Sequence, residues 1–101
     1  MAARELIVRG PTYFSGGDET VFFSWLLNIG CVSEVEGHAR SLHICLKRQP
    51  SDADLRELIA LFWRYRMSMK PLAALKTPRN AAWFANDPTV YWHAKVFGKA
   101  R

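Results

Sequence analysis

Cysteines and long apolar runs are both scarce in this chain of 101 residues. Its two cysteines, Cys31 and Cys45, form no C-x-x-C pair, so there is no disulfide framework and no zinc or dithiol redox motif. Both fall in predicted strands among apolar neighbours, where we expect buried, reduced thiols; the pattern leaves a disulfide between them open. No apolar run approaches the roughly 18–20 residues of a membrane-spanning helix, and the N-terminus is too charged for a signal peptide. We therefore expect a cytoplasmic protein.

Motifs for catalysis and for cofactors are missing as well. Gly16-Gly17 precedes a predicted helix, but neither G-x-x-x-x-G-K-[ST] nor G-x-G-x-x-G is present to support a phosphate site. His43 and Cys45 share one strand face, yet they stand about 6–7 Å apart, too far for a nucleophile and its base. His43 and His93 lie in predicted strands without a third metal ligand at a useful spacing. We expect no enzyme, no cofactor and no metal.

The composition that is present is that of one folded domain spanning residues 1–101. Half of the residues are apolar, and 4 Trp, 3 Tyr and 6 Phe can stabilise a small core. The formal net charge is +5, from 14 basic and 9 acidic residues. The basic residues are spread from Arg4 to Arg101, with Lys47–Arg48 as the only adjacent pair, so charge alone gives little support to nucleic-acid binding.

The first half of the chain predicts a strand, a helix and a hairpin. Glu5 to Arg9 is apolar and β-branched and ends at Gly10-Pro11. A helix follows from about Asp18 to Asn28, with Gly30 placed for a left-handed C-terminal residue. The hairpin turns at 37–40. Its second arm, 41–47, alternates strictly between apolar and polar residues. The predicted apolar stripe of the helix consists of Val21, Phe22, Trp25, Leu26 and Ile29.

The second half predicts one well-marked helix and a final strand. Ser51 is the N-cap, Asp54 can complete a capping box, and the helix should stop before Pro71. The segment 70–84 is less regular, with short helical turns near each end. Val90 to Phe97 alternates again and predicts a strand covered on both faces. The apolar stripe of the helix is Leu55, Leu58, Ile59 and Phe62.

These elements follow the order β–α–β–β–α–(α)–β. We therefore predict an α+β fold, with an antiparallel sheet of about four strands and two main helices on one face. The order is that of a ferredoxin-like βαββαβ sandwich.

An aromatic and basic run, Phe62-Trp63-Arg64-Tyr65-Arg66, is of the kind that stacks on bases. Phe62 lies on the helix core stripe, and Trp63 and Tyr65 lie at its borders, so we favour core and boundary positions. A small basic nucleic-acid-binding or regulatory domain is the alternative function.

A pattern spread over nearly the whole chain resembles a family of small bacterial immunity proteins, which protect cells from polymorphic toxins, including those of contact-dependent growth inhibition. It consists of Gly10-Pro11-Thr12-Tyr13-Phe14, Phe22-Phe23-x-Trp25-Leu26, Leu58-Ile59-Ala60-Leu61-Phe62-x-Arg64-Tyr65, Met69-x-x-Leu72, Asn80-x-x-Trp83-Phe84 and Tyr91-Trp92-x-x-x-Val96-Phe97-Gly98. The resemblance implies a non-catalytic protein, without cofactor, that binds one cognate toxin domain. The matching positions are aromatic or aliphatic, so they describe a core and carry over no contact residue.

Polar residues outside that pattern are the candidates for the contact surface. We select Glu34, Glu36, His38 and Arg40 of the hairpin, and then Arg64 and Arg66 of the second helix. Immunity proteins against nucleases are commonly acidic, because opposite charge steers association with basic toxins. This chain is basic overall, so a basic toxin would have to meet local acidic ground, for which Glu34, Glu36, Asp18 and Glu19 are available.

Overall fold

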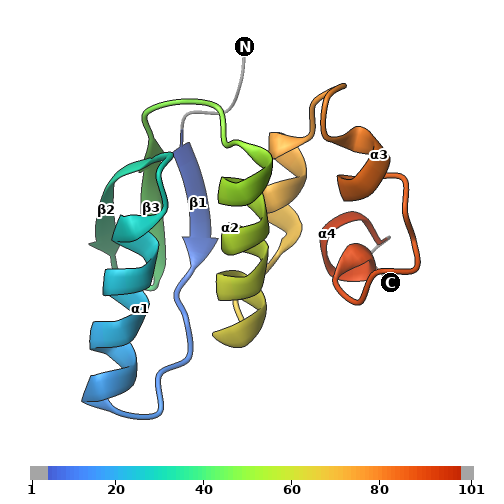
Figure 1. The fold of residues 1–101 in the computed structure, drawn as a ribbon. Helices are drawn as coiled ribbons and strands as arrows, with labels where there is room; N and C mark the ends of the chain where they lie inside the picture. The colour runs from blue at the N-terminus through green and yellow to red at the C-terminus, as the bar shows by residue number, and fades with distance from the viewer. Residues whose placement is uncertain (1–4, 99–101) are drawn as a thin grey trace.

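A three-stranded antiparallel sheet lies behind two main helices in the computed structural model of the chain, which describes residues 5–98 (Figure 1). Arg4 and Arg101, which bound the spread of basic residues, lie outside this range. The strands have the order β1-β3-β2, so both edges belong to strands joined through α1. The elements are β1 (Glu5–Arg9), α1 (Gly16–Asn28), β2 (Val32–His38), β3 (Ser41–Leu46), α2 (Asp52–Arg64), η1 (Lys70–Leu75), α3 (Ala81–Phe84) and α4 (His93–Phe97).

Alternation along the strands gives the sheet one apolar face. Leu6 pairs with Ile44 and Val8 with Leu42, and all four side chains are buried. Because paired residues share a face, this face meets α1 and α2 and forms the core between the two layers. A register shift between Val32 and Glu34 interrupts the pairing of β2 with β3.

Capping residues fix where α1 begins. The Ser15 hydroxyl accepts a hydrogen bond from the Asp18 N–H at 3.1 Å, and the Asp18 carboxylate accepts one from the Phe14 N–H at 3.0 Å. The apolar stripe of α1 that faces the core is narrower than predicted, because Phe22 and Leu26 are buried while Val21 is 56% exposed. The predicted left-handed residue at Gly30 is wrong: Ile29 leaves the helix in an extended conformation, and the chain passes directly into β2.

The capping box at α2 is confirmed. The Ser51 hydroxyl accepts from the Asp54 N–H, and the Asp54 carboxylate accepts from the Ser51 N–H, both at 3.1 Å. The helix ends in a Schellman motif, because the Met67 N–H bonds to the Phe62 carbonyl and the Arg66 N–H to the Trp63 carbonyl. Arg66 takes the left-handed position with φ 58°. Leu55, Leu58, Ile59 and Phe62 are buried, as predicted.

The predicted fourth strand at 90–97 is wrong. Val90 to Trp92 form a turn and His93–Phe97 is the helix α4, so the sheet has three strands instead of about four. The segment satisfies its hydrogen bonds locally, with the Val96 N–H bonding to the Trp92 carbonyl. Trp92 and Val96 are both buried, which suits a helical spacing of four as well as alternation. The predicted α+β class is confirmed.

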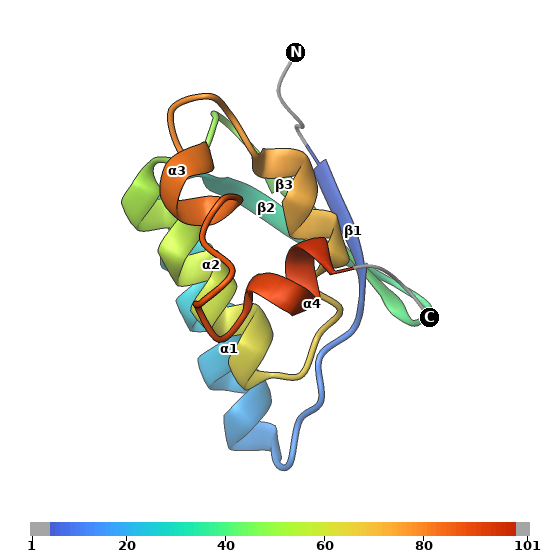
Figure 2. The same ribbon diagram turned by 90° about the vertical axis from the view of Figure 1, so that its right-hand side faces the viewer.

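The C-terminal helices extend the core beyond the sheet. Figure 2 shows η1 beside β1, at the edge where another strand would pair. The Phe84 ring lies 5.6 Å from the Trp92 ring and 5.0 Å from the Phe97 ring, which ties α3 to α4. Within residues 5–98 no helix is both long and apolar enough to cross a bilayer.

Candidate functional site

The face of the sheet turned away from α1 and α2 is the main candidate site. Its side chains come from alternate positions of all three strands, and we call this set the open face. Within residues 5–98 no helix covers it, and Ile7, in the middle of the edge strand β1, is accordingly 55% exposed. The open face consists of Glu5, Ile7 and Arg9 of β1, Ser41, His43 and Cys45 of β3, and Glu34, Glu36 and His38 of β2.

A line of polar contacts crosses the open face from one edge strand to the other. The His43 Nδ1 atom lies 3.1 Å from the Glu5 carboxylate, and the His38 Nε2 atom lies 3.1 Å from the Glu36 carboxylate. The two imidazole rings are in contact, with their centroids 4.5 Å apart. These contacts join β1, β3 and β2 side by side, so the sheet presents the polar groups as one ordered surface.

Cys45 lies on the open face among three carboxylates and is half-buried, not fully buried as predicted. Partial desolvation raises the pKa of its thiol, and the nearby charges of Glu5, Glu34 and Glu36 raise it further. A thiol with a raised pKa stays protonated at neutral pH and is a poor nucleophile. The nitrogen Nδ1 of His43 faces the Glu5 carboxylate at 3.1 Å.

Cys31 lies on the other side of the sheet, in the core. Its side chain is fully buried, and burial together with the charge of Asp54 raises the pKa of the thiol to about 11. Both cysteines are free, which answers the question of a disulfide. His93 is on α4 and faces the Ala85 carbonyl at 2.8 Å, so it is not the strand histidine that was predicted. Among residues 5–98 there is no group of three or more metal-ligating side chains.

The structure brings together only part of the predicted contact set. Glu34, Glu36 and His38 share the open face, and Arg40 follows in the hairpin turn, where its carbonyl accepts a hydrogen bond from the Gly10 N–H. Arg64 and Arg66 lie elsewhere, at the C-terminal end of α2.

Glu5 was missed as a member of the face. Strand alternation alone could have placed Glu5 on the face of the sheet opposite to that of Leu6. Its position beside His43, however, depends on the pairing of β1 with β3. The Asp18 carboxylate, proposed as part of the acidic ground, accepts a hydrogen bond from the Phe14 N–H just before α1.

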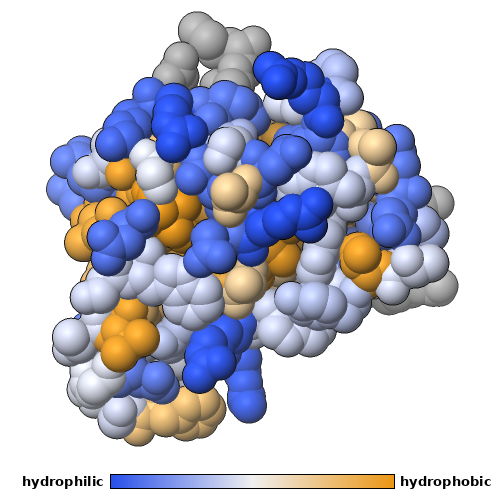
Figure 3. All heavy atoms as spheres, in the orientation of Figure 1, coloured by the Kyte–Doolittle hydropathy of each residue, from blue (hydrophilic) through white to orange (hydrophobic). Residues whose placement is uncertain are grey.

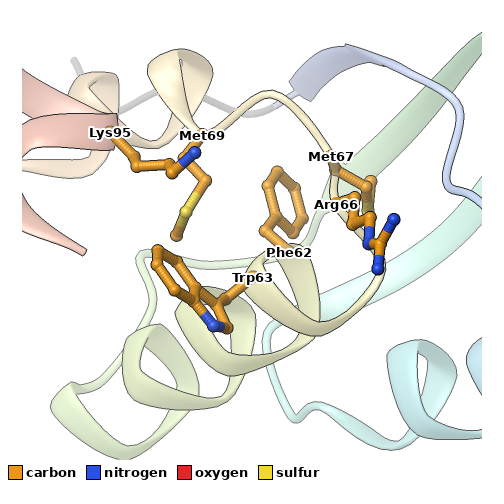
Figure 4. A pocket seen from close by; sticks show the side chains of 6 residues that line it. All are labelled: Phe62, Trp63, Arg66, Met67, Met69 and Lys95. Carbon is orange, nitrogen blue, oxygen red and sulfur yellow. The ribbon is translucent and has the colours of Figure 1, made fainter. Parts of the chain in front are cut away.

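A second feature, which we call the basic cleft, lies at the end of α2. Its cavity has a volume of about 400 Å³. Figure 4 shows the six side chains that line it, which are Phe62, Trp63, Arg66, Met67, Met69 and Lys95. An adjoining hollow of about 450 Å³ shares four of these residues and adds Lys70. Sequence reasoning missed this cleft, because it forms only where α4 returns to α2.

Among residues 5–98, the exposed apolar side chains on the helical side of the molecule are scattered and do not form one docking patch. Figure 3 shows its apolar areas separated by hydrophilic ones. Two of the exposed apolar side chains, Val21 and Leu27, lie on α1 at 56% and 53% exposure. Scattered apolar residues of this kind are ordinary on a protein surface and mark no site.

Comparisons with protein-family models, with curated proteins and with solved structures gave no match. The function is therefore argued from the open face and the basic cleft.

Proposed function

We propose that this chain is a non-catalytic immunity protein that binds and neutralises a cognate bacterial toxin domain through its open face. The observation that carries the proposal is the uncovered, polar sheet face backed by a packed core. A sheet face of this kind holds its side chains in place before binding, so a partner loses little conformational entropy in ordering them. The resemblance of the chain's apolar pattern to immunity proteins supports the same function.

The charge of the open face agrees with a basic partner. It carries Glu5, Glu34 and Glu36 against a single arginine, Arg9, although the chain as a whole has a net charge of +5. Opposite charges across an interface speed encounter and disfavour wrong partners. Local acidity on this face therefore answers the objection that the chain is too basic to inhibit a basic toxin.

The size of the face indicates how far the contact extends. Three strands about 4.8 Å apart and about 17 Å long cover roughly 250 Å² in plan. Specific interfaces bury about 800 Å² on each partner. We expect the contact to continue onto the hairpin turn at Arg40 and along the outer edge of β2.

The test uses capture followed by protection from toxicity. Tagged wild-type protein and a Glu34→Lys/Glu36→Lys variant are used to capture partners from the bacterium that encodes the chain. A control variant, Asp52→Lys/Glu57→Lys, makes the same change in net charge on exposed positions of α2. A captured toxin domain is then expressed with each protein, and growth is measured.

We expect the wild-type and control proteins to hold the toxin and restore growth, while the open-face variant does neither. Equal protection by the open-face variant would assign the contact to another surface. Failure of the wild-type protein to protect against any captured partner would refute the immunity function.

A small nucleic-acid-binding domain remains the second candidate, because the basic cleft combines Arg66, Lys70 and Lys95 with the exposed ring of Trp63. Such a protein would bind an oligonucleotide with an affinity that falls by orders of magnitude between about 50 and 200 mM salt.

We also propose that residues 5–75 form a ferredoxin-like unit in which η1 takes the place of the last strand. The strand order β1-β3-β2 and the position of η1 beside β1 support this assignment.

A further inference from the structure

The basic cleft carries charge of one sign. Among residues 5–98, its charged lining residues are Arg66 and Lys95, with Lys70 in the adjoining hollow, and this part of the lining contains no carboxylate. Met67, Met69 and Phe62 form an apolar floor, and all three are buried. A cavity of about 400 Å³ is within the range of small-ligand pockets. The cleft therefore suits a small ligand that is both apolar and anionic.

Trp63 supplies a flat surface at one end of the cleft. Its side chain is 41% exposed, and the edge contact with Tyr91, at 4.7 Å between ring centroids, holds the indole in place. The Lys95 ammonium lies 5.6 Å from the indole centroid, and Figure 4 shows Lys95 and Met69 reaching toward Trp63. An aromatic ring stacked on the indole would thus have a cation beside it for an attached anionic group.

Arg66 faces the cleft from a backbone position that normally belongs to glycine. Its φ of 58° is the left-handed residue of the Schellman motif, where a side chain lowers stability. Among residues 5–98 it has no carboxylate within ion-pair distance, and its guanidinium lies 5.4 Å from the Phe14 ring centroid. Its contact with the Phe14 ring leaves the charge of the guanidinium without a counter-ion among residues 5–98, so this charge is available to an anionic ligand.

We propose that the basic cleft binds a small anion that carries an aromatic ring, with a nucleoside monophosphate as its chemical class. The ring stacks on Trp63, and the phosphate is held by Lys95 and by Arg66 from the opposite end of the cleft. This site is separate from the open face and does not rest on the proposed function.

The test is calorimetric titration of the purified chain with AMP, with adenosine and inorganic phosphate as probes of the two halves. We expect AMP to bind with a Kd of about 1 mM or tighter, at least tenfold tighter than adenosine or phosphate. Trp63→Ala and Lys95→Gln should each weaken AMP binding about tenfold. Arg66→Gly should weaken it about fivefold while the Tm stays equal or rises, a combination that a merely structural arginine would not give.

The matched control is Arg64→Gln, which removes the same charge from the same helix end but outside the cleft lining. We expect its Kd to lie within about twofold of wild type. No detectable binding of AMP, or an equal loss in the Arg64 and Lys95 variants, would overturn the proposal. An octathymidylate that binds far more tightly than AMP would also overturn it, in favour of an extended strand site. The Glu34→Lys/Glu36→Lys variant should bind AMP normally, so the two proposals fail independently.

Discussion

At the scale of single residues, the two residues with left-handed backbone in residues 5–98 are both unusual, because neither is glycine. They are Ala39, with φ 55°, and Arg66, with φ 58°. Ala39 is the first residue of the two-residue turn between β2 and β3, the position that glycine prefers in hairpins with one left-handed residue. Its methyl group makes no contribution to the core, since the residue is exposed.

Ala39→Gly should therefore stabilise the protein. Removing the strained Cβ should raise the free energy of unfolding by about 1 kcal/mol. Glycine also gives the unfolded chain more conformational freedom, which offsets part of this gain, so we expect a net increase of about 0.5 kcal/mol. Urea unfolding followed by circular dichroism would measure it. Ala53→Gly, on the exposed side of α2, is the control and should lose about 1 kcal/mol. A loss at both positions would contradict the strain at Ala39.

Phe62 and Trp25 differ in cost although the sequence places both on core stripes. Phe62 is fully buried, so Phe62→Ala should cost about 3–5 kcal/mol. Trp25 only packs against the core, and its indole N–H donates to the Glu57 carboxylate at 2.8 Å on the surface. We expect Trp25→Ala to cost about half as much. Denaturant unfolding of the two variants would decide, and equal costs would show that Trp25 belongs to the core proper.

Cys31 should make the protein sensitive to alkali. Its pKa is about 11 when folded against 9.0 in the reference state, so the unfolded chain loses the proton first as pH rises. Below pH 9 both states keep the proton and stability is unaffected. Between pH 9 and 11 the free energy of unfolding should fall by up to about 1.4 kcal/mol per pH unit. Cys31→Ala should show a flatter decline over this window in urea titrations, whereas parallel curves would mean that the thiol does not titrate as described.

At the scale of secondary-structure elements, the sequence predicts best where local signals agree with long-range packing. The capping box at Ser51 and the alternation of β3 mark elements that the structure contains. The failure at 90–97 has a physical cause. The buried residues Trp92 and Val96 are four positions apart, so they would lie on one face of a strand and also on one face of a helix. In the structure the segment forms helical hydrogen bonds within itself. No local pattern distinguishes these outcomes; the packing of Trp92 against Phe84 does.

The capping box should be the main local determinant of α2. Ser51→Ala removes the acceptor for the Asp54 N–H and should cost about 1 kcal/mol. Ser51→Asp keeps an acceptor at the N-cap and should restore most of that loss. Thermal unfolding of both variants would test this. If alanine and aspartate were equally destabilising, the hydroxyl would have a role other than capping.

At the scale of the whole molecule, the predictable part of the site is the part that lies on one hairpin. Glu34, Glu36 and His38 are two residues apart, so alternation alone puts them on one face. The membership of Glu5 requires the pairing of β1 with β3, and the cleft requires α4 to lie against the end of α2. Both depend on contacts between distant segments, which a single sequence does not specify.

The surface charge of the molecule is asymmetric, because acidic residues lie on the open face and basic residues lie around the cleft. If a basic partner docks on the open face, its association rate should fall as salt screens the three glutamates, because the Debye length shortens from about 30 Å at 0.01 M to about 10 Å at 0.1 M. Glu34→Lys/Glu36→Lys should slow association at least tenfold at low salt and progressively less as salt rises. Stopped-flow binding of the captured toxin domain would measure both effects.

Lys95→Gln is the control that separates the two surfaces. It changes the charge of the cleft and leaves the open face intact, so it should alter the association rate by less than about twofold at any salt concentration. A large effect of Lys95→Gln together with none of the glutamate reversal would place the partner at the cleft. Because the two surfaces have opposite charge, that outcome would also mean that the partner is acidic and not basic.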